Sequence, residues 1–294
     1  MSESVSAAAV GRFTEHQGLL YAVAYRVLGS VVDAQDVVQD AWLRWSRVDA
    51  GTIDDAEGYL VRVVTRLAID RRRSAVVRRE AYVGPWLPEP MLTAPDAAQD
   101  VVRADAVSTA MLLVLEALSP VERAVFVLNE AFGYSYTEIA GILGRHVADV
   151  RQLAHRARKA VAARRRRYDT DTAVQRQVTE RFLTACLTGD VEALMAVLAP
   201  DVTLISDGGG LTGAPRKPIF GPLYVARAFV VLSGRRPEGS QLEIRELNGA
   251  PGLVIYAAGK AVVAATFHLV DGAVQTIHVV SNPNKLTGLL SHPR

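Results

Sequence analysis

The chain has 294 residues, half of them hydrophobic and 22% charged, which excludes an intrinsically disordered protein and is enough for two or three folded domains. Its formal net charge is only +2, and its single cysteine, Cys186, excludes an internal disulfide and is typical of a reducing compartment. The local charge is more informative. Residues 62–79 hold seven arginines against one acid, and residues 145–167 hold nine lysines or arginines against one. Each basic segment can attract phosphate, although acidic segments elsewhere cancel the total charge.

Residues from about 14 to 80 predict three helices. An apolar stripe from Leu19 to Leu28 ends at Gly29, where glycine suits the left-handed turn that closes a helix. A second helix is predicted over residues 33–45, with Val37, Ala41 and Trp45 toward the core and Asp33, Asp36 and Asp40 along one flank. A third helix is predicted from Ala56 to about Arg73, with Tyr59, Val63, Leu67 and Ala68 inward and Arg62, Arg66, Asp70 and Arg73 outward.

A proline-rich segment follows the three helices and predicts an extended linker. Residues 82–95 contain four prolines in fourteen residues, which excludes a continuous helix. Trp86 and Leu87 are expected to anchor this segment to a surface. Helices resume beyond it, and Ser119-Pro120 predicts the cap and first position of a new helix.

Residues 134–167 have the pattern of a helix-turn-helix that continues into a long basic helix. A short apolar helix over 136–143 is followed by a turn at Gly144. The next helix, from Val147, places one apolar stripe and one cationic stripe on different faces. The apolar stripe is Val150, Leu153, Ala157 and Val161, and the cationic stripe contains Arg151, His155 and Arg158. Such a helix suits insertion into a DNA major groove, although an ordinary helical hairpin with a solvated basic face has the same pattern.

The last 120 residues change to a mixed pattern that predicts an α+β cone. Two helices between 174 and 199 precede short β-rich runs, with hairpin turns at Asn248-Gly249 and Asp271-Gly272. The most apolar window, 252–270, is interrupted by Gly259 and predicts a hairpin and not a membrane span. The first sixteen residues have no basic leader or long apolar core, so no signal peptide is expected and we predict a cytoplasmic protein.

Several segments together resemble the extracytoplasmic-function (ECF) sigma-70 factors. The segments are DAQDVVQDAWLRW (33–45), GYLVRVVTRLAIDRRR (58–73), LSPVERAVFVLNEAFGYSYTEIAGILG (118–144) and VRQLAHRARK (150–159). WLPEP (86–90), DGGG (207–210) and NPNKL (282–286) resemble a subgroup that carries a SnoaL-like C-terminal extension. The resemblance departs from the subgroup pattern at Leu211, where the family has lysine, and at Asn284, where it has aspartate.

The resemblance implies two all-α sigma-factor domains, the second with a helix-turn-helix, followed by an α+β SnoaL-like cone. The expected boundaries are 1–80, a linker at 81–98, 99–168, and 169–294. It implies a transcription factor of the stress-response type that is not an enzyme, needs no cofactor or metal, and does not associate with a membrane. The implied partners are promoter DNA and the β′ clamp helices of RNA polymerase core, and an anti-sigma partner is left open.

The implied site residues form four groups. Contact with the −35 promoter element is expected from Arg145, Arg151, Gln152, His155, Arg156, Arg158 and Lys159. Contact with the −10 element is expected from Tyr59, Arg62, Arg66, Arg71 and Arg73. Polymerase binding is expected from Asp33, Asp36, Gln39, Asp40 and Trp42. A regulatory contact between the extension and the sigma domains is expected from Trp86, Leu87, Pro88, Asp207, Gly208, Gly209, Asn282, Pro283, Lys285 and Leu286.

Two other functions remain compatible with the sequence. A helix-turn-helix repressor would bind promoter DNA without polymerase. A polyketide cyclase or ketosteroid isomerase fused to a DNA-binding module would use a pocket carboxylate or histidine for proton transfer, with Asp207, His268 and His278 as candidates. The last reading rests on the fold alone, because a shared fold does not imply a shared function.

Overall fold

The computed structural model describes residues 7–93, 108–164 and 172–289, and these divide into two compact units. The first unit comprises Met1–Glu80, Pro95–Val107 and Met111–Arg164. The second comprises Ala81–Ala94, Ser108–Ala110 and Arg165–Arg294. The proline-rich segment therefore belongs to the same unit as the C-terminal domain, and the expected resumption of helix near residue 96 lies outside the described residues.

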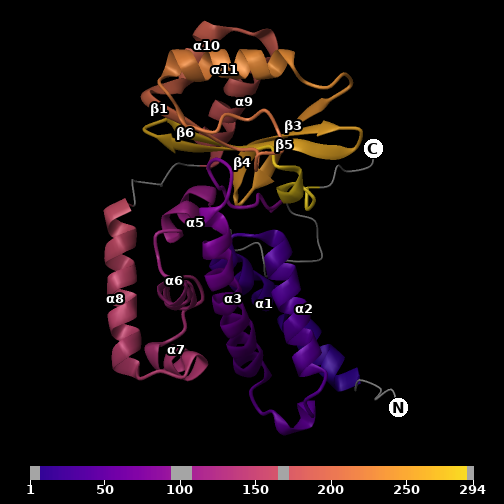
Figure 1. The fold of residues 1–294 in the computed structure, drawn as a ribbon, viewed down its shortest axis with the longest axis vertical. Helices are drawn as coiled ribbons and strands as arrows, with labels where there is room; N and C mark the ends of the chain where they lie inside the picture. Colours follow the sequence, from indigo (N-terminus) through magenta and orange to yellow (C-terminus); the bar gives the residue numbers. More distant parts are fainter. Residues whose placement is uncertain (1–6, 94–107, 165–171, 290–294) are drawn as a thin grey trace. The chain divides into compact units, whose positions relative to one another are not determined.

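The first half of the first unit is a bundle of three helices, α1 (Ala7–Leu28), α2 (Val31–Trp45) and α3 (Ala56–Glu80), which lie side by side in Figure 1. α1 ends at Gly29, whose φ is 71° as the sequence predicts. The side chain of Ser30 caps α2 by accepting a hydrogen bond from the Asp33 amide. A short 3₁₀ turn, η1 (Ala50–Thr52), connects α2 to α3. The predicted core face of α2 is confirmed, because Val37, Ala41 and Trp45 are all buried.

The second half of the first unit contains α5 (Thr109–Leu115) from Met111 onward, α6 (Pro120–Phe126), a π-helical turn η2 (Val127–Ala131), α7 (Tyr136–Leu143) and α8 (Val147–Arg164). Ser119 and Glu122 form a reciprocal capping box at the start of α6, and Ser135 and Glu138 form another at α7. Gly144 ends α7 with a left-handed φ of 65°. The predicted stripe of α8, Val150, Leu153, Ala157 and Val161, is buried.

The second unit is an α+β layer structure, in which three helices cover one face of a six-stranded sheet (Figure 1). The helices are α9 (Thr172–Thr188), α10 (Val191–Val197) and α11 (Pro222–Gly234). The strands are β1 (Leu198–Asp207), β2 (Ile219–Phe220), β3 (Gln241–Leu247), β4 (Ala250–Ala257), β5 (Lys260–Val270) and β6 (Ala273–Val280), followed by a 3₁₀ turn η3 (Pro283–Lys285). Their order is β2-β1-β6-β5-β4-β3, with β1 and β6 parallel and the other pairs antiparallel.

The core of the second unit lies between the helices and the sheet. Phe182 of α9 is fully buried and lies against the rings of Phe229 and Phe267, with centroids 4.8 and 5.0 Å away. Aromatic pairs at this separation stabilise a core beyond their buried area. The space between the helices and the sheet is therefore filled by side chains from all three layers.

The proline-rich segment lies along the free edge of β3. Leu92 forms a β-bridge with Leu247, and the Thr93 amide donates to the carbonyl of Glu246 at 3.0 Å. The amide of Asn248 donates in turn to the carbonyl of Met91 at 2.9 Å. We call residues 81–94 the strap. It covers a strand edge that would otherwise expose unpaired backbone groups.

Three sequence-based expectations differ from the structure. α3 continues to Glu80 and does not stop near Arg73. Its fully buried positions include Leu60 and Val64, whereas Val63 and Leu67 are only half-buried, because α3 packs against α6 and α7 as well as α1 and α2. The two-residue strand β2 was not expected, because two residues are too short to show a strand pattern.

Candidate functional site

The exposed face of α8 carries the residues expected to contact the −35 element. Arg145, Arg151, Gln152, His155, Arg156, Arg158 and Lys159 are all exposed. The structure records no side-chain hydrogen bond or ion pair from Arg151, Gln152 or His155 to another described residue. Arg151 and Gln152 are adjacent, and His155 lies about one turn further along the helix, so all three side chains can meet a partner outside this chain.

Two arginines of α8 form ion pairs with acids on the preceding helical segments α6 and η2. The Nε of Arg156 donates to Glu122 at 2.9 Å, and the Nε of Arg158 donates to Glu130 at 2.6 Å. A second nitrogen of Arg158 donates to the hydroxyl of Tyr136 at 2.6 Å. Intramolecular partners at these positions lower the number of cations that are immediately available to phosphate.

The residues of α3 expected to contact the −10 element are in different environments. Arg62 and Arg73 are exposed, and Arg73 pairs with Asp70 one turn away. Tyr59 is half-buried beside Trp45, with ring centroids 5.7 Å apart. Arg62 is therefore exposed and has no recorded side-chain partner among the described residues.

Arg66 and Arg71 both contact neighbouring helices. The Nε of Arg66 donates to the carbonyl of Ile142 at the end of α7, at 2.9 Å. Arg71 forms ion pairs with Asp33 at 2.5 Å and Asp36 at 2.6 Å. Asp33 and Asp36 raise the pKa of Arg71 against the opposing effect of burial. The structure thus joins one residue expected at DNA to two residues expected at polymerase.

The remaining residues expected at polymerase lie on the outer face of α2. Gln39 and Asp40 are exposed, and Trp42 is half-buried against Phe13 with ring centroids 5.0 Å apart. The same helix exposes 47% of Leu43. An exposed leucine beside accessible acids is a better match to a protein partner than to DNA, because the acids repel phosphate.

The residues expected to form the regulatory contact gather around the side chain of Asp207, at the end of β1. Asp207 has no exposed surface. Its carboxylate accepts from the amide of Leu87 at 2.8 Å and from the Nζ of Lys285 at 2.7 Å. Lys285 also donates to the carbonyl of Leu87 at 2.6 Å. Sequence segments around residues 87, 207 and 285 therefore meet in one buried ion pair of the second unit.

Aromatic groups of the strap complete this cluster. The Nζ of Lys285 lies 4.2 Å from the ring centroid of Trp86 and 5.0 Å from that of Tyr82. The hydroxyl of Tyr82 donates to Asp207 at 2.6 Å and accepts from Asn282 at 2.8 Å. Burial, followed by the hydrogen bond to Asp207, raises the pKa of Tyr82. We call Tyr82, Trp86, Asp207, Asn282 and Lys285 the strap cluster.

The other residues expected at this contact border the strap cluster. Gly209 has a φ of 58°, its amide donates to Asp207 at 3.1 Å, and an added Cβ would collide with Asn282. The DGGG run forms a turn, in which the amide of Leu211 donates to the carbonyl of Gly208 at 2.9 Å. Pro88 and Leu286 are buried and Pro283 is exposed. Leu211, which stands where the subgroup has lysine, is 62% exposed.

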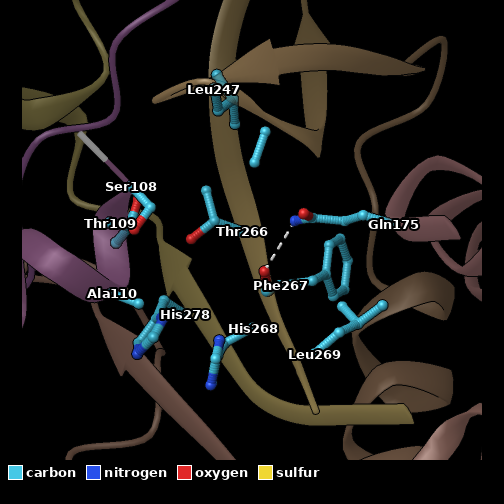
Figure 2. Close-up of a pocket in the computed structure, with 11 residues that line it drawn as sticks. Ser108, Thr109, Ala110, Gln175, Leu247, Thr266, Phe267, His268, Leu269 and His278 are labelled. Carbon is cyan, nitrogen blue, oxygen red and sulfur yellow. Dashed lines mark hydrogen bonds between the residues drawn. The ribbon is translucent and has the colours of Figure 1, made fainter. Parts of the chain in front are cut away.

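A small pocket of about 60 Å³ is lined by residues of β5 and β6, by Gln175 of α9 and by residues 108–110 (Figure 2). Thr266 on β5 is the direct cross-strand partner of His278 on β6, and both line the pocket with His268. Burial, followed by the neighbouring His268, lowers the pKa of His278 to about 4. The two histidines thus lie in the same pocket (Figure 2).

The pocket does not contain the carboxylate that a cyclase or isomerase reading requires. Asp207 does not line it, and its oxygens are occupied in the strap cluster. The lining that faces the histidines comes from Ser108, Thr109 and Ala110. Proton transfer by Asp207 and a histidine acting together is therefore not supported by their placement.

Sequence reasoning missed a second set of buried polar residues, in the first unit. Arg72 and Arg123 are 1% and 0% exposed, and both donate to the carboxylate of Glu116. Tyr82 and Asn248 were likewise not singled out as contacts of the strap. The sequence gives no signal that separates Arg72 or Arg123 from the exposed arginines, because burial depends on contacts with residues far away in the chain.

Among the described helices, none has the length and apolarity needed to cross a bilayer. The described residues also include no group of three or more His, Cys, Asp or Glu side chains placed to share a metal ion.

Family models match both halves of the first unit. The model for sigma-70 region 2 matches residues 12–77, and the model for sigma-70 region 4 matches residues 108–161. We use region 2 and region 4 for these two ranges below. Region 2 contains α2 and most of α3, and region 4 contains α6, α7 and most of α8.

Two named proteins resemble nearly the whole chain. The ECF RNA polymerase sigma factor SigJ of Mycobacterium tuberculosis (strain ATCC 25618 / H37Rv) is 38% identical over 294 residues, covering 95% of this chain and 93% of that protein. The protein named "Probable ECF RNA polymerase sigma factor SigI" of the same species (strain CDC 1551 / Oshkosh) is 33% identical over 280 residues, covering 93% of each. The crystal structure of M. tuberculosis SigJ matches with a TM-score of 0.74 at 35% identity, over 96% of this chain and all of that one. The match extends through the SnoaL-like C-terminal domain.

Proposed function

We propose, from the premise that the chain belongs to the ECF sigma factors of the sigma-70 family, that it binds RNA polymerase core and directs promoter-specific initiation of transcription. The observation that carries the proposal is the presence of both promoter-reading regions, each with an exposed cationic helix, in one chain. A repressor would need only the helix-turn-helix, so region 2 favours a sigma factor over that alternative.

Region 4 would read the −35 element through α8. Arg151 would contact phosphates or guanine edges, and Gln152 would contact a base edge in the major groove. His155 would contact the same element from the same exposed face. Arg145, Arg156, Arg158 and Lys159 extend the same surface. Arg156 and Arg158 would exchange their present carboxylate partners for phosphate on binding.

Region 2 would contact both the −10 element and polymerase. Arg62, Arg66 and Arg73 on α3 would hold the strand backbone, and Tyr59 would stack on an unpaired base. On α2, Asp40 and Gln39 together with Leu43 would dock on the β′ clamp helices. Arg71 stabilises Asp33 and Asp36 through ion pairs, so we assign it an indirect role in presenting this acidic surface.

The SnoaL-like domain would regulate this activity through the strap. The strap lies between region 2 and region 4 in the chain, so its conformation determines how far the two regions can separate. The segment 81–107 has 27 residues and could span about 90 Å if fully extended. Because Asp207, Lys285 and Asn248 bind residues 82–91 to the C-terminal domain, that reach is reduced while the strap is bound. Release of the strap would restore it.

In vitro transcription with purified core enzyme tests the proposal directly. The full chain should convert core into a holoenzyme that initiates from a subset of genomic promoters, and core alone should not. Truncation after Tyr168 should change the output from those promoters, because it removes the domain that holds the strap. Failure to associate with core in a pull-down would contradict the proposal, and unchanged output after truncation would contradict the regulatory role.

A further inference from the structure

A cavity in the second unit holds polar groups that neither the strap nor the promoter-reading surfaces use. The hydroxyl oxygen of Thr266 is buried there and has no hydrogen-bond partner among the described residues. His278, which is only 6% exposed, lines the same pocket. Buried polar groups in folded proteins ordinarily have partners, so such a group beside a cavity can be satisfied by a bound molecule. We propose that this pocket binds a short-chain monocarboxylate, with the carboxylate group between His268 and His278.

The polar side chains of the pocket alternate along their strands with side chains of the core. On β5, Thr266 and His268 flank Phe267, which belongs to the core of the second unit. On β6, His278 follows Ile277, which belongs to the same core. Successive side chains of a strand point to opposite faces of a sheet, so the three polar side chains point away from Phe267 and Ile277. They can therefore meet a ligand while the core stays packed.

The residues that line the pocket determine the charge that it accepts. Those that the structure describes include no aspartate, glutamate, lysine or arginine. An anion is therefore not repelled, and its countercharge has to come from a protonated histidine. His278 lies directly opposite Thr266 on the neighbouring strand, which makes His268 its diagonal neighbour. Diagonal neighbours are about 7–8 Å apart at the backbone, a separation that leaves room for one carboxylate between the two rings.

The volume of the pocket limits the ligand to a few atoms. The cavity has about 60 Å³, and one water needs about 10–15 Å³ measured in the same way, so about four or five non-hydrogen atoms fit. This volume excludes a polyketide or a steroid. Figure 2 shows Leu247 at one end of the pocket and the two histidines at the other, and Ala250 also lines it. An apolar end and a polar end match acetate or propionate better than a fully polar anion such as phosphate.

Binding of the carboxylate is coupled to uptake of a proton. Burial, followed by the neighbouring His268, lowers the pKa of His278 to about 4, so this ring is neutral at pH 7. Residues 108–110, which line the pocket from another segment, are Ser, Thr and Ala and carry no charge. A carboxylate beside the imidazole favours the protonated ring and raises its pKa. Binding therefore moves one proton from solvent to a ring nitrogen of His278 and forms an ion pair, and no covalent bond forms or breaks.

The pocket also includes the residues at which region 4 begins. Residues 108–110 line it and belong to the second unit, and the chain enters the first unit at Met111. The match to region 4 starts at the same residue 108. A ligand that contacts these residues and the two strands together strengthens the attachment of residues 108–110 to the C-terminal domain. This regulatory consequence rests on the proposed sigma-factor function, whereas the binding of the carboxylate does not.

NMR signals of the histidine rings test the site in the full-length protein. Proton–carbon correlation spectra of the rings are recorded during titration with sodium acetate at pH 7 and at pH 6, at constant ionic strength. Saturation should move the His278 signals toward the imidazolium position. The dissociation constant should fall about tenfold from pH 7 to pH 6, because one proton binds with each anion. Acetamide, which has the shape of acetate without its charge, should bind at least about tenfold more weakly at pH 6 and with no dependence on pH.

Two variants and a matched control connect the signals to the pocket. His278→Gln should abolish the change of affinity with pH. Thr266→Val, which removes one hydroxyl at nearly constant shape, should weaken acetate binding about threefold to tenfold. His146→Gln, at an exposed histidine of the first unit, should bind acetate as the unmodified protein does. Saturating acetate should also slow hydrogen exchange at the amides of Thr109 and Ala110, and unchanged exchange would overturn the link to region 4.

The outcomes separate this inference from the proposed function. Acetamide that binds as tightly as acetate, or pocket variants that behave like His146→Gln, would overturn the inference. A protein that binds core but shows no saturable change with acetate would overturn it and leave the proposed function intact. Failure to bind core would contradict the proposed function and leave the result of the acetate titration unaffected.

Discussion

The ammonium group of Lys285 lies 2.7 Å from a carboxylate oxygen of Asp207, and both side chains are buried. The same lysine bonds the carbonyl of Leu87, and the same aspartate bonds the amide of Leu87. One ion pair therefore holds both backbone groups of a single strap residue.

Removing either member of this pair should release the strap. Lys285→Ala leaves the Asp207 carboxylate buried without its countercharge, a change that typically costs about 3–5 kcal/mol. We expect faster hydrogen exchange at the Leu87 amide and faster proteolysis within residues 81–94. Leu211→Lys is the matched control, because this exposed position should change stability by less than about 0.5 kcal/mol. Unchanged exchange at Leu87 in Lys285→Ala would show that other strap contacts suffice.

The buried His278 should make the second unit less stable in acid. Its pKa in the fold is about 4, below its ordinary value of 6.5, so the unfolded chain binds more protons between these values. The stabilisation is fully present above pH 6.5 and decreases as the pH falls toward 4. Between pH 7 and pH 5 the free energy of unfolding should fall by about 2 kcal/mol through this residue. Urea unfolding of His278→Gln at both pH values should show a smaller decrease than the unmodified protein, and equal decreases would exclude His278 as the cause.

Single substitutions on α8 should separate phosphate contact from base reading. Arg151→Ala should weaken binding to all promoter duplexes and reduce the slope of log affinity against log salt by about 1. Gln152→Ala should instead relax the preference at one base pair, by about 1–3 kcal/mol. Fluorescence anisotropy with −35 duplexes measures both. Arg181→Ala is the control: it removes one positive charge at an exposed position of α9, outside the proposed DNA-binding surface, and should leave DNA binding unaltered.

Charge reversal on α2 should weaken polymerase binding without affecting the fold. Asp40 is exposed, so Asp40→Lys costs little stability but places a cation on a surface that complements a positive partner. We expect the dissociation constant for core to rise at least about tenfold, measured by biolayer interferometry. Glu180→Lys is the matched control, because it makes the same charge reversal at an exposed position of α9, and it should bind core as the unmodified protein does. Equal affinity for both variants would place the polymerase surface elsewhere.

Local patterns predicted most of the secondary structure. The glycine that ends α7, the Ser119 capping box, the buried stripe of α8 and the hairpins at Asn248 and Asp271 each depend on residues close together in sequence. Backbone preference and hydrophobic period decide such features without reference to the rest of the chain. The family resemblance added the order of the domains and the expected partner classes.

Tertiary structure alone decided which charged residues are free and which are paired. The basic run Arg71-Arg72-Arg73 gives one residue paired with the acids of α2, one fully buried beside Glu116 and one exposed beside Asp70. Adjacent residues of a helix point about 100° apart, so their partners come from different elements far away in the chain. The meeting of Leu87, Asp207 and Lys285 is of the same kind. The sequence determined which groups are able to pair, and the packing of distant elements determined which pairs form.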